Sequence, residues 1–182
     1  MQSRQDEMAF DAHDWLDSIQ SDLKQGYIIR PLARDDYSKG HLDVLTVLTQ
    51  APDPGQAAWQ SRFDEMHTAQ PAAYYPLVVA TEHKIMAVGT LIVERKFLRG
   101  LGLVGHIEDI AVSKEAQGQS LGKKIILALT AIGEKVGCYK VILDCNKDNI
   151  PFYEKCGYVH KEYEMVRYTP EEVLKAARSA SS

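Results

Sequence analysis

The sequence predicts one α/β domain, an α+β arrangement in which helices flank a mixed central sheet. A chain of 182 residues with 45% hydrophobic and 25% charged residues has the size and composition of one ordinary globular domain. Its hydrophobic pattern alternates between the two-residue period of strands and the longer period of helices. The resulting order is strand, two helices, three strands, helix, strand, helix, strand. That order lacks the strict βαβ alternation of a doubly wound nucleotide-binding fold, so a mixed sheet follows.

The organised part of the chain is expected to begin near residue 26. Residues 1–25 are polar, with apolar side chains at loosely helical spacing, which predicts a mobile tail or a short helix on the surface. Residues 27–30 form a short β-like run that Pro31 stops. Two helical patterns follow, and the second carries Trp59, Phe63 and Met66 on one face.

Three strands are then predicted in succession, because β-branched and aromatic residues dominate residues 74–81, 85–94 and 106–112. After them a helical period over residues 121–136 indicates a long helix that ends near Gly137. A buried strand at 140–145, a short helix at 149–155 and a last strand at 158–168 complete the expected domain, 26–168. Thr169 and Pro170 are a good helix start, so residues 169–182 are expected to form a short helix or tail.

Charge and composition exclude several classes of protein. The net charge of -4 argues against a general nucleic-acid binder. No apolar run reaches the roughly 18 residues of a transmembrane segment, and the N-terminus lacks the apolar core of a secretory signal. The three cysteines lack the paired spacing of a zinc site, which favours free thiols in a reducing cytoplasm. No spacing of histidines supports a metal site or a Ser/His/Asp triad.

The run QGQSLGKK, residues 117–124, lies between a strand and the long helix. Its glycines let backbone N–H groups approach a ligand, and the first helical turn offers unpaired donors and a partial positive charge, which suit a pyrophosphate. Lys123 and Lys124 oppose the helix dipole unless a polyanion binds there. The same residues also fit a solvated loop in which Ser120 is the N-cap. Neither the P-loop nor the GxGxxG spacing is present.

The ordered elements, with QGQSLGKK following IEDIAV, resemble the GNAT superfamily of acetyl-CoA-dependent N-acetyltransferases. Within it, the strings ERKF, GHIEDIAV, GCYKVILDC and PFYEKCGY resemble the glucosamine 6-phosphate N-acetyltransferase family over residues 27–168. The resemblance implies the GNAT fold, acetyl-CoA as cosubstrate without a metal, and direct acetyl transfer to the sugar 2-amino group in a ternary complex, as a step of UDP-N-acetylglucosamine biosynthesis. Ser120 departs from the family, because it replaces a glycine of the turn and serine tolerates positive φ poorly. The chain after Tyr168 also extends beyond the compact family form.

Glu108 and Asp109 are neighbours on a predicted strand, so strict alternation points their side chains to opposite faces. From the residues alone an ordinary pair of strand charges is the simpler interpretation. The resemblance implies instead that Glu108 removes the amine proton, through water, and that Asp109 grips the amine or sugar. It also implies that Tyr153 donates to the departing thiolate, the alternative being a packed aromatic ring.

The resemblance assigns the coenzyme to three further segments. Backbone N–H groups of the strand are expected to bond pantetheine and polarise the thioester carbonyl. The glycine turn is expected to hold the pyrophosphate, and Asn149 either bonds the pantetheine arm or simply caps a helix. These cofactor-binding candidates are Ile110, Ala111, Val112, Gln117, Gly118, Gln119, Ser120, Leu121, Gly122, Lys123, Asn149 and Tyr153.

Binding a sugar phosphate requires cationic side chains, and the resemblance indicates which surface residues supply them. The substrate-binding candidates are Thr49, Lys96, Arg99, Glu108, Asp109, Tyr139, Lys140 and Arg167, with His106 as a polar neighbour. The resemblance also implies a homodimer with the sugar site at the interface, where the other subunit contributes Arg167 or its neighbours. Without it, scattered basic residues are ordinary solvated surface.

Two other functions stay open from the sequence. A GNAT enzyme that acts on protein lysines or N-termini predicts an open groove for an extended peptide and indifference to glucosamine 6-phosphate. A non-catalytic acyl-CoA-binding module is the other. The joint presence of Glu108, Asp109 and Tyr153 argues against that module.

Overall fold

The computed structural model describes residues 13–180, which form two compact units, one ending at Cys145 and one beginning at Asn146. The first twelve residues of the expected tail lie outside the described residues. The elements of the first unit are α1 His13–Ser21, β1 Ile28–Pro31, the 3-10 helix η2 Asp36–Lys39, α2 His41–Leu45, α3 Gln56–His67, β2 Tyr74–Ala80, β3 Ile85–Arg95, α4 Leu98–Leu101, β4 Leu103–Val112, the 3-10 helix η3 Lys114–Ala116, α5 Leu121–Lys135 and β5 Cys138–Ile142.

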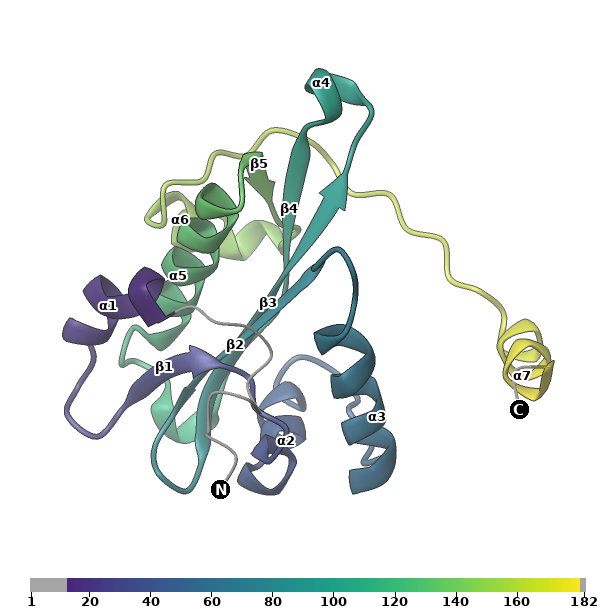
Figure 1. Cartoon of the computed structure of the whole chain (residues 1–182), viewed down its shortest axis with the longest axis horizontal. Coiled ribbons are helices and arrows are strands. Elements are labelled where there is room, and N and C mark those ends of the chain that lie inside the picture. The colour runs from purple at the N-terminus through teal and green to yellow at the C-terminus, as the bar shows by residue number, and fades with distance from the viewer. Residues whose placement is uncertain (1–12, 181–182) are drawn as a thin grey trace. The chain divides into compact units, whose positions relative to one another are not determined.

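Within the described residues, one five-stranded sheet runs in the order β1-β2-β3-β4-β5 (Figure 1). Strands β1 to β4 are antiparallel, and β5 is parallel to β4, so the predicted mixed sheet is confirmed. The boundaries differ by a few residues. Strand β1 includes Pro31, which pairs with Leu77, because an edge strand tolerates a residue without an N–H.

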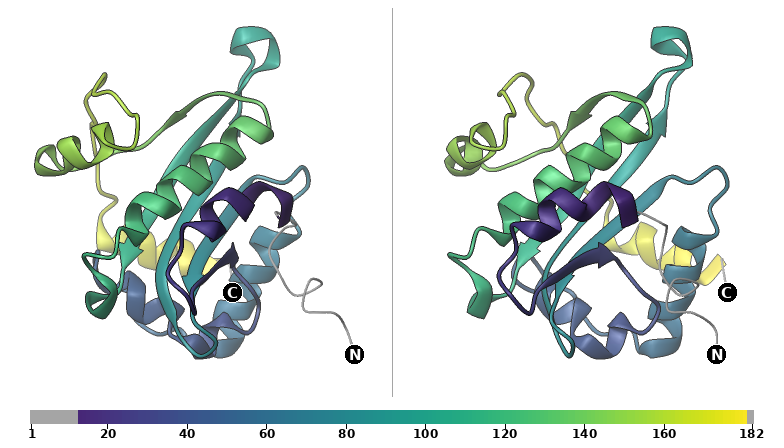
Figure 2. Two further views of the ribbon diagram at one scale, coloured as in Figure 1. Left: turned by 90° about the vertical axis from the view of Figure 1, so that its left-hand side faces the viewer. Right: turned by 60° about the vertical axis from the view of Figure 1, so that its left-hand side comes forward.

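Helices cover both faces of the sheet, and strand β3 shows which helix lies where. Val88 packs in one apolar cluster with Trp59 and Phe63 of α3, whereas the next residue, Gly89, lies against α5. A Cβ on Gly89 would stand 2.6 Å from Ile125 Cγ2, so only glycine lets α5 pack this closely. Helices α2 and α3 therefore cover one face and α5 the other (Figure 2).

The long helix α5 buries the apolar face that its sequence predicts. Ile125, Ile126, Leu129 and Ile132 are all fully buried, so the helix supplies the larger part of the core on its side of the sheet. The helix ends before Gly137, which takes a φ of +91°. The predicted C-terminal stop is therefore confirmed.

Residues 13–21 of the expected tail form helix α1, as the second of the two sequence-based alternatives predicts. It packs beside α5 and β1. The Gln20 side chain donates to the Tyr27 carbonyl at 3.0 Å and accepts the Ile29 N–H at 2.9 Å. These two bonds fasten the helix to the edge of the sheet.

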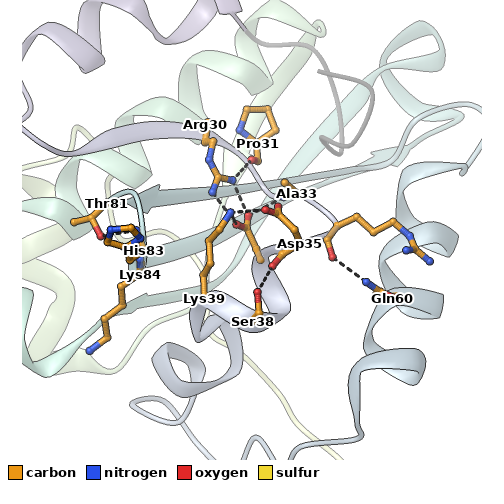
Figure 3. A network of polar contacts seen from close by, with 12 residues as sticks. Arg30, Pro31, Ala33, Asp35, Ser38, Lys39, Gln60, Thr81, His83 and Lys84 are labelled. Atoms are coloured by element: carbon orange, nitrogen blue, oxygen red, sulfur yellow. Dashed lines mark hydrogen bonds and ion pairs between the residues drawn. The ribbon is translucent and has the colours of Figure 1, made fainter. Parts of the chain in front are cut away.

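A buried ion network joins β1 to the segment that leads into α2 (Figure 3). Asp36 is completely buried and accepts two hydrogen bonds from Arg30, at 2.6 and 2.7 Å, and one from the Ala33 N–H at 2.8 Å. Lys39 donates to the same carboxylate at 3.2 Å. Burial alone raises the pKa of Asp36, but these donors outweigh it and hold the pKa below its ordinary value. The network fixes where α2 begins.

The second unit contains the 3-10 helix η4 Lys147–Asn149, α6 Ile150–Glu154 and α7 Glu171–Ala180. Helix α7 confirms the helix expected after Pro170. The strand predicted at residues 158–168 is wrong for the single chain: the segment is irregular and largely exposed, with Met165 94% exposed. A strand needs a neighbouring backbone for its hydrogen bonds, and no strand of the described chain pairs with this segment.

None of the helices in residues 13–180 combines the length and apolar character needed to cross a membrane.

Candidate active site

Glu108 and Asp109 lie where β4 departs from regular pairing. The pairs Val88–Ala111 and Thr90–Glu108 flank a β-bulge, in which Gly89 lies opposite two residues of β4. Asp109, one of those two, takes a left-handed φ of +57°. The bulge interrupts the alternation of side chains, and both carboxylate residues are exposed.

The strict alternation from which opposite faces were expected for Glu108 and Asp109 therefore does not hold at this point of β4. Thr90 is the cross-strand neighbour of Glu108, so their side chains share a face of the sheet. Thr90 and Asp109 line the same cavity, on the face covered by α2 and α3. The two carboxylate residues are adjacent in sequence, and both are exposed beside the bulge. One substrate can therefore meet both.

Strands β4 and β5 pair over only part of their length. Their ladder ends at the pair His106–Ile142, whereas β4 continues to Val112. In the described part of the chain, no strand pairs with this edge of β4 beyond His106. Ile110, Ala111 and Val112 therefore lie on a strand edge that an extended ligand with amide groups can join.

The glycine turn before α5 is an open loop at the start of a helix. Gly118 takes a φ of +79°, and a Cβ built on it would meet no atom within 4 Å. Ser120 takes a φ of +60° at the N-cap position, where its side chain makes no capping hydrogen bond. Among the described residues the first N–H groups of α5 therefore have no side-chain cap at this position, and they remain donors for an anion. Leu121 is buried and anchors the helix, while Lys123 is exposed.

A residue that the sequence did not single out holds this turn. The Tyr27 hydroxyl donates to Gln119 Oε1 at 3.1 Å, across 92 positions of sequence. A cavity of about 430 Å³ lies beside this bond, and Lys24 and Lys124 line it. Tyr27 follows α1 directly, so the edge of the sheet supports the loop.

The basic candidates of the first unit gather at the opposite end of β4. Lys96 and His106 both bond Glu94, His106 Nε2 at 3.0 Å, and these bonds hold the pKa of Glu94 below its ordinary value. The Arg99 guanidinium lies 5.7 Å from the centre of the Tyr139 ring. Lys140 pairs with Val104 on the neighbouring strand and is exposed. Thr49, a further substrate-binding candidate, lies elsewhere, on an exposed turn after α2.

The second unit carries the remaining candidates. Asn149 is the N-cap residue of α6, but its side chain makes no capping hydrogen bond in the described structure, which removes the simple cap interpretation. Tyr153 is half-buried and packs edge-on against Phe152, with ring centres 5.1 Å apart. Arg167 lies in the exposed segment before α7.

A second cavity, of about 140 Å³, lies between α2, α3 and the central strands. His41, Arg62 and Thr90 line it with Asp109, and the sequence pointed to none of the three. The Trp59 indole N–H donates to His41 Nδ1 at 3.2 Å, so the neutral ring carries its proton on Nε2. Burial lowers the pKa of His41 to about 4, against a weaker opposing effect of Asp36. These residues are far apart in sequence, and no local pattern marks them.

Within residues 13–180 no cluster of three or more His, Cys, Asp or Glu side chains has the arrangement of a metal site.

Comparison with known proteins gives one consistent result. Residues 32–158 match the Acetyltransferase (GNAT) family. The glucosamine 6-phosphate N-acetyltransferase of Candida albicans is 41% identical over 145 residues, which cover 79% of this chain and 97% of that protein. The Dictyostelium discoideum glucosamine 6-phosphate N-acetyltransferase 1 is 41% identical over 155 residues, 84% of this chain and 97% of that one.

The solved structures agree. The crystal structure of glucosamine-6-phosphate N-acetyltransferase from Arabidopsis thaliana superposes with a TM-score of 0.76 at 38% identity, covering 79% of this chain and 99% of that chain. The bulged β4, its free edge and the glycine turn before α5 lie within the matched residues. The chain belongs to the GNAT acetyltransferase family.

Proposed function

We propose that this protein is a glucosamine 6-phosphate N-acetyltransferase, which transfers the acetyl group of acetyl-CoA to the 2-amino group of glucosamine 6-phosphate in UDP-N-acetylglucosamine biosynthesis. The products are N-acetylglucosamine 6-phosphate and CoA. The relatives from Candida albicans and Dictyostelium discoideum bear this name, and the match with this chain covers 97% of each of them. The observation that carries the proposal is the free edge of β4 immediately after two exposed carboxylate residues.

The residues present fit acetyl-CoA at two places. The open loop at residues 117–120 and the uncapped start of α5 offer N–H donors to the pyrophosphate, with Lys123 as a nearby cation. The edge at Ile110–Val112 offers backbone groups to the pantetheine amides and to the thioester oxygen. Asn149 is assigned to the pantetheine arm.

The chemistry is direct acyl transfer between two bound substrates. The amine nitrogen attacks the thioester carbonyl, a C–N bond forms, the C–S bond breaks and the electron pair leaves on sulfur. Glu108 takes the surplus amine proton through a water molecule, and Asp109 holds the amine or sugar. Tyr153 supplies a proton to the departing thiolate. Holding both substrates together contributes much of the rate.

The distribution of charge supports a homodimer with shared sugar sites. Lys96 bonds Glu94, which pairs with Val104, and Glu108 lies four residues further along β4. Four residues of strand span about 13 Å of backbone, so the basic group and the carboxylates lie towards opposite ends of β4. Following the family resemblance, we assign Arg167 to the sugar phosphate bound by a second copy of the chain.

Exposed apolar side chains supply the surface that such a dimer needs. Phe97, Leu98 and Leu101, at the tip between β3 and β4, are 95%, 71% and 69% exposed. Tyr163, Met165 and Val166 are likewise exposed on the extended segment of the second unit. In each unit, neighbouring exposed apolar side chains of this kind suit a surface that a partner covers.

We place the protein in the cytoplasm. Its cysteines, Cys138, Cys145 and Cys156, are free thiols, as a reducing compartment favours. Burial raises the pKa of the Cys138 and Cys145 thiols, which makes both less reactive.

The deciding experiment measures thiol release from acetyl-CoA with three acceptors: glucosamine 6-phosphate, free glucosamine and a lysine peptide. Turnover with the phosphorylated sugar well above the other two is the expected result. Turnover with the peptide would assign the protein to the lysine-directed enzymes. Binding of acetyl-CoA without any turnover would make it a non-catalytic acyl-CoA-binding module.

A further inference from the structure

The cavity between α2, α3 and the sheet has a mainly apolar wall. Leu45, Trp59, Phe63, Met66, Leu77 and Val88 all line it. Leu77, Val88, Trp59 and Phe63 are buried, so this wall is part of the packed core. The volume of the cavity is about 140 Å³.

The cavity meets the proposed reaction centre at the bulge of β4. Gly89, Thr90 and Asp109 line it at this point. Asp109 directly precedes Ile110, whose N–H is among those assigned to the thioester oxygen. The Ile110 side chain faces α5, because its Cδ1 would lie 2.5 Å from a Cβ on Gly89. Asp109 and Ile110 therefore separate the cavity from the α5 face, and the acyl carbon would lie at the mouth of the cavity.

The wall suits an alkyl group better than a sugar. A hexosamine carries a hydroxyl on most of its carbons, and hydroxyls turned towards Leu45, Phe63 and Met66 would lose their hydrogen bonds to water. An alkyl chain loses nothing there and gains from leaving water. An apolar cavity of about 150 Å³ can hold a molecule as large as benzene, so this one has room for several carbon atoms.

Resting on the proposed function, we propose that this cavity is an acyl-chain pocket, and that the enzyme transfers propionyl and butyryl groups from their CoA thioesters to the same amine. The reaction is unchanged: the amine nitrogen displaces the CoA sulfur from the acyl carbonyl, the thiolate takes up one proton and the amine releases one. The chain beyond the carbonyl enters the pocket between α2 and α3. The depth of the pocket sets the longest acyl group.

The test compares acetyl-, propionyl-, butyryl- and octanoyl-CoA with glucosamine 6-phosphate on the full-length protein. Acetyl-, propionyl- and butyryl-CoA should give kcat/KM values within about tenfold of one another, and octanoyl-CoA should fall by about 100-fold or more because it exceeds the pocket. Rejection of propionyl-CoA by about 100-fold would overturn the proposal. No turnover with acetyl-CoA itself would instead refute the proposed function.

A pair of matched variants locates the effect. Leu45→Phe adds volume inside the pocket, whereas Leu127→Phe makes the same change on the exposed face of α5. Leu45→Phe should lower kcat/KM for butyryl-CoA by about tenfold or more relative to acetyl-CoA, and Leu127→Phe should keep the wild-type ratio. An equal loss for every donor would contradict the proposal. So would a raised KM for the sugar with an unchanged donor ratio, which would place the acceptor in the cavity.

A binding measurement makes the conclusion independent of turnover. Titration calorimetry of CoA and butyryl-CoA should show a gain in affinity from the acyl chain in the wild type and in Leu127→Phe. Leu45→Phe should lose that gain and keep its affinity for CoA, which also shows that the variant is folded. Equal affinities for both ligands in the wild type would refute an acyl pocket.

Discussion

Ser120 and Asp109 both hold a backbone conformation that residues other than glycine rarely adopt, with φ of +60° and +57°. Such conformations cost about 1 kcal/mol or more, and proteins retain them mainly at functional positions. Asp109 lies at the bulge beside the proposed thioester site, and Ser120 lies in the turn assigned to pyrophosphate. The strain thus occurs at two points that the coenzyme is proposed to contact.

Replacing Ser120 by glycine should therefore stabilise the protein. Glycine adopts a φ of +60° freely, so the free energy of unfolding should rise by up to about 1 kcal/mol, and the KM for acetyl-CoA should stay the same or fall. Urea denaturation and steady-state kinetics measure both. Ser113→Gly is the control, because Ser113 has a φ of -55° and its replacement should destabilise. A large loss of coenzyme affinity in Ser120→Gly would mean that the hydroxyl contacts the ligand.

Tyr153 offers a direct test of the proposed leaving-group donor. Tyr153→Phe keeps the ring and its edge-on packing against Phe152 but removes the hydroxyl. We expect kcat to fall by about 100-fold and the KM for acetyl-CoA to change little, since the hydroxyl acts mainly in the transition state. Tyr74→Phe, at an exposed position with no proposed role, should leave kcat unchanged. An unchanged kcat in Tyr153→Phe would remove this residue from the mechanism.

Asp36 should control stability in acid. Its folded pKa lies below the ordinary value, so its contribution is complete above about pH 4 and is lost as the pH falls through the folded pKa. Asp36→Asn removes a buried charge that Arg30 and Lys39 require, which should cost about 3 kcal/mol or more at pH 7. The free energy of unfolding of the variant should also lack the decrease in acid that protonation of Asp36 causes in the wild type. Denaturation between pH 3 and 7, the wild type against the variant, measures both effects.

The matched control is Asp64→Asn. Asp64 also pairs with an arginine, Arg34, but both side chains are roughly half exposed. Its loss should cost less than about 1 kcal/mol. Equal costs for the two substitutions would contradict the importance of the buried network.

At the scale of elements, β4 and the extended segment at 158–168 both have backbone that no strand of the described chain pairs with. Strand β4 has an edge without a strand beside it after His106, and the segment has strand-forming residues without a partner strand in the described chain. A free edge binds whatever extended backbone fits it. We assign the edge of β4 to pantetheine and the segment to a second copy of the protein.

Proline in this segment should weaken that association. Val166→Pro removes an N–H and fixes φ, both of which oppose strand pairing. Light scattering after size exclusion should give a dimer mass for the wild type and a shift towards monomer for Val166→Pro. Val166→Thr retains a β-branched side chain and should remain dimeric. A monomeric wild type, or an unaffected proline variant, would refute this role.

At the scale of the whole molecule, we propose that two chains complete one sugar site, with the carboxylates supplied by one chain and Arg167 by the other. Glu108→Gln should lower kcat, and Arg167→Ala should raise the KM for the sugar phosphate and spare acetyl-CoA. After subunit exchange, a mixture of the two variants should recover part of the wild-type activity, because mixed dimers contain one intact site. Steady-state assays of the mixture measure this recovery.

The control mixes Glu108→Gln with Asp109→Asn. Both residues are proposed to act in the site of one and the same chain, so every mixed dimer lacks an intact site and activity should not return. If the first mixture also fails to recover while native mass spectrometry shows mixed dimers, each site belongs to one subunit.

Features that depend on local pattern could be predicted from the amino-acid sequence. The apolar period of α5, the strands of the sheet and the turn at residues 117–120 all follow from neighbouring residues, and the structure confirms these elements. The family strings around Glu108 and Asp109 were also readable directly. Such features are predictable because backbone geometry and side-chain period act over a few positions.

The surroundings of those residues depend on packing between segments that are distant in sequence. A single bulge opposite Gly89 interrupts the strict alternation of side chains at Glu108 and Asp109. The bond from Tyr27 to Gln119 and the cavity beside Asp109 join segments that are far apart in sequence. The segment at 158–168 has the composition of a strand but lacks a partner strand in the described chain. Each of these features depends on which segments of backbone lie side by side. Local sequence pattern does not encode that arrangement.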